Sequence, residues 1–266
     1  MASRKEQKEA ARERRLAEER VRADKARRER RLRMLGGIAV GTIAVIAAVF
    51  AISSGGGNNS APKPNTAQAK NAAATVTKLL NGIPQQGNTL GNPNAKVTLT
   101  EYGDLVCPVC KDFAVGTQSQ LIASDVRSGK VKIVWKALET ASQTANHSMF
   151  VPSQAAALAA GQQKLGWDYI ELFYHEQGDE TASYVTNSYL DGLAQQVPGL
   201  NYSKWSSDRQ SPTLAGQVSS DRLSAANAGF NSTPTLVLQG PKGQAQPIVG
   251  NPTSYAQLES AINSVS

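Results

Sequence analysis

The chain contains two cysteines, Cys107 and Cys110, separated only by Pro108 and Val109. On a helix, residues three apart lie on one face, about 5–6 Å from each other. A disulfide can bridge that separation. Two such sulfurs can therefore cycle between a dithiol and a disulfide. The pair predicts thiol–disulfide redox chemistry, which needs no metal and no bound cofactor because the sulfurs carry it.

The flanking sequence predicts where the two sulfurs lie. Residues 97–102 alternate between apolar and polar side chains and include β-branched residues, as is typical of a strand. Residues 131–135 predict a second strand. A helix from the cysteines to Gly129 completes a right-handed βαβ unit. Because Cys107 would begin that helix, free N–H groups and the positive dipole end stabilise its thiolate. We expect Cys107 to be the attacked sulfur and Cys110 the shielded resolving partner.

Three other uses of the pair compete with redox cycling. A structural zinc site needs four ligands, and His147 and His175 are the only histidines. A structural disulfide across so short a loop would add little stability, and two thiolates can carry copper. For the histidines themselves, a surface or capping position is expected for His147. His175 is expected at a helix end, where it suits the dipole.

The positive charge is confined to the start of the chain. Residues 1–33 hold 14 Lys or Arg and 7 Asp or Glu, which accounts for the whole net charge of +7. The remaining 14 basic and 14 acidic side chains cancel. A neutral body gives no electrostatic support for binding nucleic acid.

A run of 19 residues without charge follows, at 34–52. As a helix it would extend roughly 30 Å, the thickness of a bilayer core. The arginines just before it should stay in the cytoplasm, so the rest of the chain would lie outside. A cleaved signal peptide is the alternative, although the run is longer than a signal core. We expect a charged cytoplasmic arm at 1–33 and a transmembrane anchor at 34–53.

The remainder predicts a tether and one domain. Residues 54–72 are rich in Gly, Ser, Asn, Pro and Ala, which is typical of a flexible linker. Residues 73–266 are enough for one domain with a sizeable core. Its further elements are expected to be a helix at 154–174 capped by Ser153, helices at 183–197 and 213–228, a hairpin of 235–239 and 245–249 with Pro247 at its edge, and a helix at 254–265.

Three features together resemble the membrane-anchored, bacterial DsbA-like branch of the thioredoxin superfamily. They are the segment LLNGIPQQGNTLGNPNAKVTLTEYGDLVCPVC, the helical stretch after the second strand, and the sequence GFNSTPT at 229–235. The resemblance implies an α/β thioredoxin fold. A helical insertion at about 150–228 would separate its second and third core strands.

The resemblance also implies roles for single residues. Pro234 would be cis and face the cysteines, so that the backbone of Thr233 pairs with an extended substrate; an ordinary trans proline is the alternative. Glu101 would be a buried acid, with a pKa raised by desolvation, that relays a proton for Cys110. The alternative is a strand-end glutamate that reaches solvent. Asp104 is expected to be a turn residue. Pro108 and Val109, between the cysteines, are expected to contact substrate.

The resulting hypothesis is an extracytoplasmic oxidant that introduces disulfides into exported proteins. Its expected partners are unfolded or partly folded protein thiols, a quinone-linked membrane thiol oxidase as regenerator, and the lipid bilayer. A reductase or isomerase of the same fold is the main alternative, because Val109 stands where strong oxidants of the family carry a histidine. A peptide-binding or copper-carrying module without catalysis is the third.

Overall fold

The computed structural model describes residues 61–252 and 254–266. The predicted arm at 1–33 and anchor at 34–53 lie outside the described residues, as do residues 54–60 of the predicted linker. Within the described part, no helix has the length and apolar character needed to cross a bilayer. The anchor therefore stays a prediction from the sequence.

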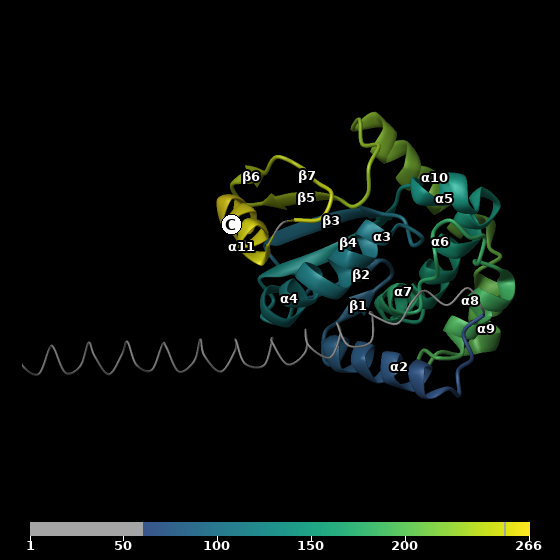
Figure 1. Cartoon of the computed structure of the whole chain (residues 1–266). Coiled ribbons are helices and arrows are strands. Elements are labelled where there is room, and N and C mark those ends of the chain that lie inside the picture. Colours follow the sequence, from purple (N-terminus) through teal and green to yellow (C-terminus); the bar gives the residue numbers. More distant parts are fainter. Residues whose placement is uncertain (1–60, 253) are drawn as a thin grey trace, which may run out of the picture. The chain divides into compact units, whose positions relative to one another are not determined.

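A seven-stranded sheet forms the centre of the domain (Figure 1). Its strand order is β1-β2-β4-β3-β5-β6, and β7 also pairs with β5. The central strand β3 is parallel to β4 and antiparallel to β5. The strands are β1 (Gln85–Gln86), β2 (Thr89–Leu90), β3 (Val97–Gly103), β4 (Val131–Ala137), β5 (Thr235–Gly240), β6 (Gly243–Gln244) and β7 (Ile248–Val249).

The predicted βαβ unit is confirmed. A continuous helical stretch with two π-helical segments leads from β3 to β4, and a glycine with φ of 77° at Gly129 ends it. Alternation along β3 buries Val97, Leu99 and Glu101 on one face. The stretch consists of α3 (Pro108–Phe113), η1 (Ala114–Gln118), α4 (Ser119–Leu121) and η2 (Ile122–Val126).

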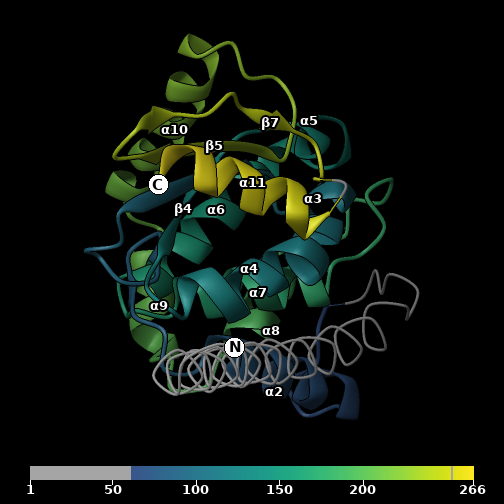
Figure 2. The same ribbon diagram turned by 90° about the vertical axis from the view of Figure 1, so that its left-hand side faces the viewer.

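A helical insertion lies between β4 and β5, as predicted. Outside it, α2 (Ala67–Leu80) packs on α7, and the final helix α11 (Tyr255–Val265) packs on β5 (Figure 2). The insertion contains α5 (Ala141–Ala145), α6 (His147–Gly161), α7 (Gly166–His175), α8 (Asn187–Ala194), α9 (Tyr202–Asp208) and α10 (Pro212–Asn227).

The single helix predicted at 154–174 is wrong, because the chain turns between α6 and α7. Lys164 has a left-handed backbone there, with φ of 62°. A Cβ added to Gly161 or Gly166 would come within 2.4 or 2.8 Å of the Gly87 carbonyl oxygen. The turn thus depends on close contact with the hairpin between β1 and β2. Ser153 caps nothing: it lies inside α6 and donates to the Phe150 carbonyl at 2.8 Å.

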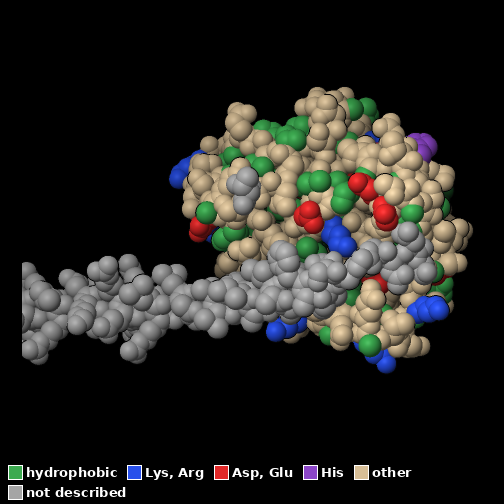
Figure 3. Space-filling model, viewed as in Figure 1, with side chains coloured by type: hydrophobic (Ala, Val, Ile, Leu, Met, Phe, Trp, Pro, Cys, Tyr) green, Lys and Arg blue, Asp and Glu red, His purple; other side chains and the backbone are tan. Residues whose placement is uncertain are grey.

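Other boundaries differ less. The helix α8 is shorter than the predicted 183–197, because Thr186 caps its start. Part of the range expected as flexible linker is helical, since α2 begins at Ala67. The short elements β1, β2, α5 and α9 were not predicted. On the face shown in Figure 3, acidic and basic side chains are interspersed, as expected for a neutral body.

Candidate active site

The two cysteines begin α3, where Cys107 is the N-cap and Pro108 the first helical residue. Pro108 suits that position because it has no N–H to leave unsatisfied. The Cys107 sulfur lies 3.6 Å from the Thr233 carbonyl oxygen. Cys107 retains 6% exposure, whereas Cys110 is fully buried. The structure therefore leaves a small part of Cys107 accessible and covers Cys110 completely.

The two sulfurs differ in acidity. A hydrogen bond with the Cys110 side chain is the largest effect on Cys107 and lowers its pKa to about 6, against the opposing effect of burial. Contacts with Thr233 and with two backbone N–H groups contribute to the same shift. Burial raises the pKa of the Cys110 thiol well above its usual value. The attackable sulfur is thus a thiolate at neutral pH, and the resolving sulfur is a thiol.

The loop opposite Cys107 has the geometry that the resemblance implied. The peptide bond between Thr233 and Pro234 is cis. Thr233 turns its carbonyl toward the Cys107 sulfur, and its hydroxyl lies 2.5 Å from that of Thr140. The Pro234 carbonyl accepts from Gly250 N at 2.7 Å, which ties the loop to the end of β7.

Asp104 holds the turn between β3 and α3. It is fully buried. Its Oδ1 accepts from Val106 N at 3.0 Å and from the Ser142 hydroxyl at 2.5 Å. Its Oδ2 accepts from the backbone N–H groups of Thr140 at 2.9 Å and Ser142 at 2.8 Å. The sequence interpretation as a turn residue missed this link from the cysteine loop to the start of the insertion.

The same loop also accepts hydrogen bonds from residues at the end of α7 and just beyond it. The Gln177 side-chain amide donates to the carbonyls of Leu105, at 2.8 Å, and Cys107, at 3.2 Å. The Tyr174 hydroxyl donates to the Asp104 carbonyl at 3.4 Å. The insertion therefore positions the attackable sulfur.

Glu101 is fully buried, so the alternative of a glutamate reaching solvent is wrong. Desolvation raises the pKa of Glu101 to about 8, although a hydrogen bond from the Gln118 amide opposes the shift. Glu101 also acts electrostatically on Cys110 and raises the pKa of that thiol. A protonated acid thus lies within electrostatic reach of the resolving sulfur.

A second buried acid, Glu171 on α7, escaped the sequence reasoning. Burial, followed by the charges of Glu101 and Asp168, raises its pKa well above the usual value. Its spacing of three from Asp168 and four from His175 was the available signal. That spacing puts three titratable side chains on one face of a helix.

The histidines lie apart from the sulfur chemistry. His147 is exposed, as expected, and its Nδ1 lies 2.5 Å from a Glu139 carboxylate oxygen. His175 does end α7, but burial and the charge of Lys111 lower its pKa to about 4. A neutral ring gains little from the helix dipole, so that part of the expectation is wrong. Among the described residues, no group of three ligands suits a metal ion.

A sequence model of the family described as Thioredoxin matches residues 85–264, which is more than half of the chain. The chain belongs to the thioredoxin family. Given this family and this pair of cysteines, it is a protein-disulfide oxidoreductase, as predicted.

Individual relatives agree. Disulfide bond formation protein D of Bacillus subtilis is 24% identical over 205 residues, covering 74% of this chain and 83% of the relative. The oxidised crystal structure of BdbD from Bacillus subtilis has a TM-score of 0.57 at 21% identity, covering 68% of this chain and 96% of that one. DsbA of Chlamydia trachomatis has a TM-score of 0.55 at 18% identity, covering 66% and 89%. These structures support a DsbA-like thioredoxin fold with its helical insertion.

Between the cysteines, Val109 is 40% exposed and Pro108 is half-buried. Val109 thus presents an apolar side chain to solvent beside the attackable sulfur. The chemical and substrate-binding roles of these residues remain predictions. They are Cys107, Cys110, Glu101, Pro108, Val109, Thr233 and Pro234.

Proposed function

We propose that this protein is a membrane-tethered, extracytoplasmic oxidant that introduces disulfides into exported proteins through the pair Cys107–Cys110. The observation that carries the proposal is the asymmetry of the two sulfurs. A lowered pKa at Cys107 stabilises the dithiol form relative to the disulfide, and a disulfide whose reduced form is stabilised is a strong oxidant.

The reaction begins with the disulfide form. A substrate thiolate attacks the Cys107 sulfur, the bond to Cys110 breaks, and Cys110 leaves as a thiolate that takes a proton from Glu101. A second substrate thiolate then attacks the substrate sulfur of the mixed disulfide and releases Cys107 as a thiolate. The substrate is oxidised by two electrons and the pair is reduced to its dithiol form.

Substrate would dock on the loop that faces Cys107. An extended polypeptide can pair with the backbone of Thr233 beside Pro234, which holds its cysteine in line with the sulfur. The exposed Val109 and its neighbour Pro108 offer apolar contacts to an unfolded chain. This arrangement accepts many sequences, because the backbone carries most of the recognition.

The proposed location rests on the sequence before the described residues. The uncharged run at 34–52 follows 14 Lys or Arg in residues 1–33, which favours an amino terminus in the cytoplasm and a catalytic domain outside. In the proposed cycle, a quinone-linked thiol oxidase in the same membrane reoxidises the dithiol.

Thiol trapping in cells tests the direction of electron flow. Cells that express the chain are quenched in acid and alkylated with a maleimide polymer, and the two redox forms are separated by gel mobility. We expect mostly disulfide in wild type. Mostly dithiol would make the protein a reductase or isomerase instead, the candidate favoured by the absence of a cation at Val109.

A second measurement separates an enzyme from a binding module. Replacing Cys107 by Ser should abolish oxidation of a dithiol peptide by the purified chain. Unchanged peptide binding together with no oxidation even in wild type would indicate a non-catalytic module.

A further inference from the structure

Four polar atoms in the interior behind Cys110 have no hydrogen-bond partner among the described residues. They are Oε1 of Glu101, Oε1 of Gln118 and both carboxylate oxygens of Glu171. The helix α7, which carries Glu171, packs against η1, which carries Gln118. Unpartnered buried polar atoms are costly and rare in native proteins. Several of them behind one functional sulfur point to a use.

The same face of α7 leads toward solvent. Asp168 lies three residues before Glu171, hence on the same side of the helix. Asp168 retains 8% exposure, whereas Glu101 and Glu171 have none. Its Oδ2 accepts from the Gln85 side-chain amide at 2.7 Å, and Gln85 Oε1 accepts from Trp167 N at 3.0 Å.

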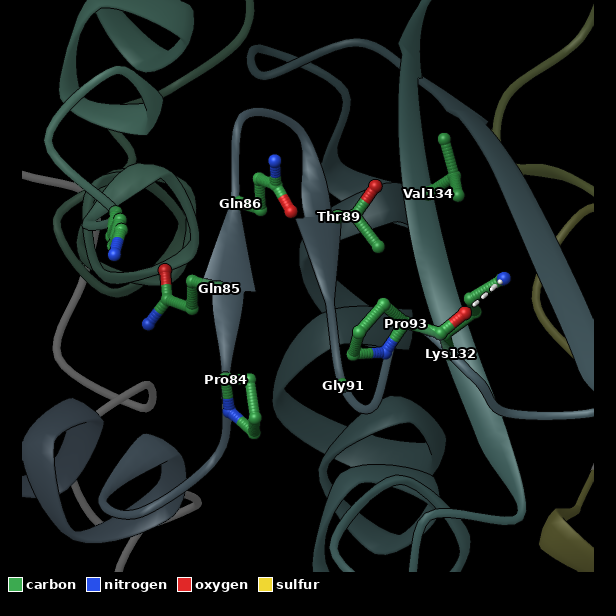
Figure 4. Close-up of a pocket in the computed structure, with 9 residues that line it drawn as sticks. Pro84, Gln85, Gln86, Thr89, Gly91, Pro93, Lys132 and Val134 are labelled. Carbon is green, nitrogen blue, oxygen red and sulfur yellow. Dashed lines mark hydrogen bonds between the residues drawn. The ribbon is translucent and has the colours of Figure 1, made fainter.

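Gln85 connects this face to an open pocket at the other side of β1. The pocket has a volume of about 590 Å³ and is also lined by Thr89, Lys132 and Lys164. Figure 4 shows Gln85 on β1, with its side chain directed away from β2. Gln85 thus lies between Asp168 and the pocket, which Asp168 itself does not line, and Asp168 reaches solvent only through its own 8% exposed surface.

Electrostatic effects connect these groups. Cys110 is influenced by Glu101, and Glu171 by both Glu101 and Asp168. Of the other titratable groups, Tyr174 also faces Glu101 and the cysteines. Three more groups near α3 form a separate set: Lys111 acts on His175 and on Glu176.

We propose that Glu101, Glu171 and Asp168 form a proton relay between Cys110 and the solvent that reaches Asp168, with Glu171 and Asp168 acting through Glu101. The proposal rests on the proposed function, because the relay serves exchange at Cys107–Cys110. Glu171 and Asp168 are positioning residues for the proton. Neither touches the reacting sulfurs.

Each step conserves charge and protons. When the disulfide is attacked, the Cys110 thiolate takes the proton of the Glu101 carboxyl. Glu101 takes a proton from Glu171, and Glu171 takes one from Asp168, each through a bridging water, because Glu171 shares no hydrogen bond with either carboxyl group. Asp168 takes its proton from solvent. When the dithiol is reoxidised, the protons move in the opposite direction, from Cys110 outward.

The physical need for a relay lies in the burial of Glu101. A carboxylate left without water is strongly disfavoured. Transfer of the negative charge to Asp168, which has some exposure and a hydrogen bond from Gln85, relieves that cost. Cys110 has no exposed surface, because Cys107 and its loop cover it on the other side. Protons therefore do not reach Cys110 directly from solvent on that side.

Exchange of the Glu101 proton can be followed directly by rapid-mixing infrared spectroscopy. The whole chain of 266 residues, in disulfide form at pH 6, is mixed with deuterated buffer. The carbonyl band of the protonated Glu101 carboxyl is identified by its loss in Glu101→Gln, and its shift reports arrival of deuterium. We expect Glu171→Gln and Asp168→Asn each to slow this shift by at least about tenfold.

Three controls make the result specific. Glu176→Gln removes another buried carboxyl of the α7 end, coupled to Lys111 rather than Glu101, and should leave the rate unchanged. Glu171→Asp, which retains an exchangeable acid, should restore most of the rate. Backbone amide exchange, which a merely structural effect would change, should match wild type in all variants.

The outcomes separate this proposal from the one on which it rests. An unchanged exchange rate in both Glu171→Gln and Asp168→Asn would overturn the relay. If Glu171→Gln does not fold, Asp168→Asn at the exposed end decides alone. Reduction of the same disulfide by dithiothreitol, measured in parallel, tests the sulfur chemistry. If wild type fails to react there, the proposed function is wrong, whatever the infrared result.

Discussion

Cys107 and Cys110 lie one turn apart at the start of α3, yet their surroundings have opposite chemical character. In front of Cys107 are the Thr233 carbonyl, threonine hydroxyls and the exposed Val109. Behind Cys110 lies an interior that contains two acids held above their usual pKa by burial. At the front, hydrogen bonds from Cys110, the Thr233 side chain and two backbone N–H groups lower the pKa of Cys107; at the rear, burial raises the pKa of Cys110 and of the acids behind it. The difference shows how one short motif gains two unequal sulfurs from its neighbours.

The largest effect on activity should come from replacing one cysteine at a time. We expect oxidation of a dithiol peptide to fall to background in both Cys107→Ser and Cys110→Ser. Only Cys110→Ser should accumulate a covalent complex with substrate, because the attackable sulfur remains and its resolving partner is absent. Non-reducing electrophoresis of the reaction measures this. Equal amounts of complex in the two variants would remove the distinction between front and rear.

The next largest effect concerns stability at the rear. Glu101 has a pKa of about 8 when folded and about 4.5 when unfolded, so its favourable contribution is complete below pH 4.5 and disappears as pH rises through 8. The free energy of unfolding should fall by on the order of 4 kcal/mol over that interval. Glu101→Gln should remove most of this fall.

Urea unfolding of the disulfide form at pH 5 and pH 8 isolates the contribution of Glu101, because sulfurs joined in a disulfide do not titrate. In the dithiol form, Cys107 acts in the opposite direction. Its folded pKa of about 6 lies below the ordinary 9.0, so its contribution is complete above pH 9 and is lost as pH falls through 6. If the free energy of unfolding changes equally with pH in wild type and in Glu101→Gln, Glu101 is not the buried acid responsible for the change.

Asp104 tests the loop that joins the two regions. Asp104→Asn should lower the free energy of unfolding by about 2–3 kcal/mol, since hydrogen bonds to a buried carboxylate are weakened and an amide N–H is brought among donors. Urea unfolding at pH 7 measures the loss. The change in unfolding free energy with pH that is due to Glu101 should persist in this variant. Its disappearance would mean that the loop held by Asp104 and the interior around Glu101 do not contribute independently to stability.

The smallest effect is expected at the front. Thr233→Val removes a hydrogen bond that lowers the pKa of Cys107, so the pKa should rise above about 6. Loss of one such bond should slow exchange at pH 6 by about threefold. Titration of the 240 nm thiolate absorbance follows the shift, and Thr233→Ser, which retains the hydroxyl, is the matched control. An unchanged titration in Thr233→Val would show that this hydroxyl does not act on the sulfur.

The front of the site was largely predictable from the sequence because its signals are local. The spacing of the cysteines and Pro108 at the first helical position fix the N-cap. The alternation of β3 likewise indicates the burial of Glu101, the one acid of the rear that the sequence revealed. Thr233 and Pro234 required the family resemblance, since nothing near them in the chain indicates that they face Cys107.

The rear was less predictable because it depends on contacts between distant segments. Glu171 was hidden within a helix predicted to run unbroken from 154 to 174. The break depends on the Gly87 carbonyl, which approaches Gly161 and Gly166 from a hairpin that the sequence did not predict. The direction of α7, and with it the side that Glu171 faces, follows from that contact.

The same backbone contact constrains how this architecture can be recombined. Deleting the insertion would remove Glu171, Tyr174 and Gln177, and with them one of the two interior acids and the hydrogen bonds that Tyr174 and Gln177 donate to the cysteine loop. Transplanting the insertion alone would separate the turn after Gly161 from the Gly87 carbonyl against which it is shaped. A viable chimera must therefore exchange the β1–β2 hairpin and the helices together, as one module assembled from two distant stretches of chain.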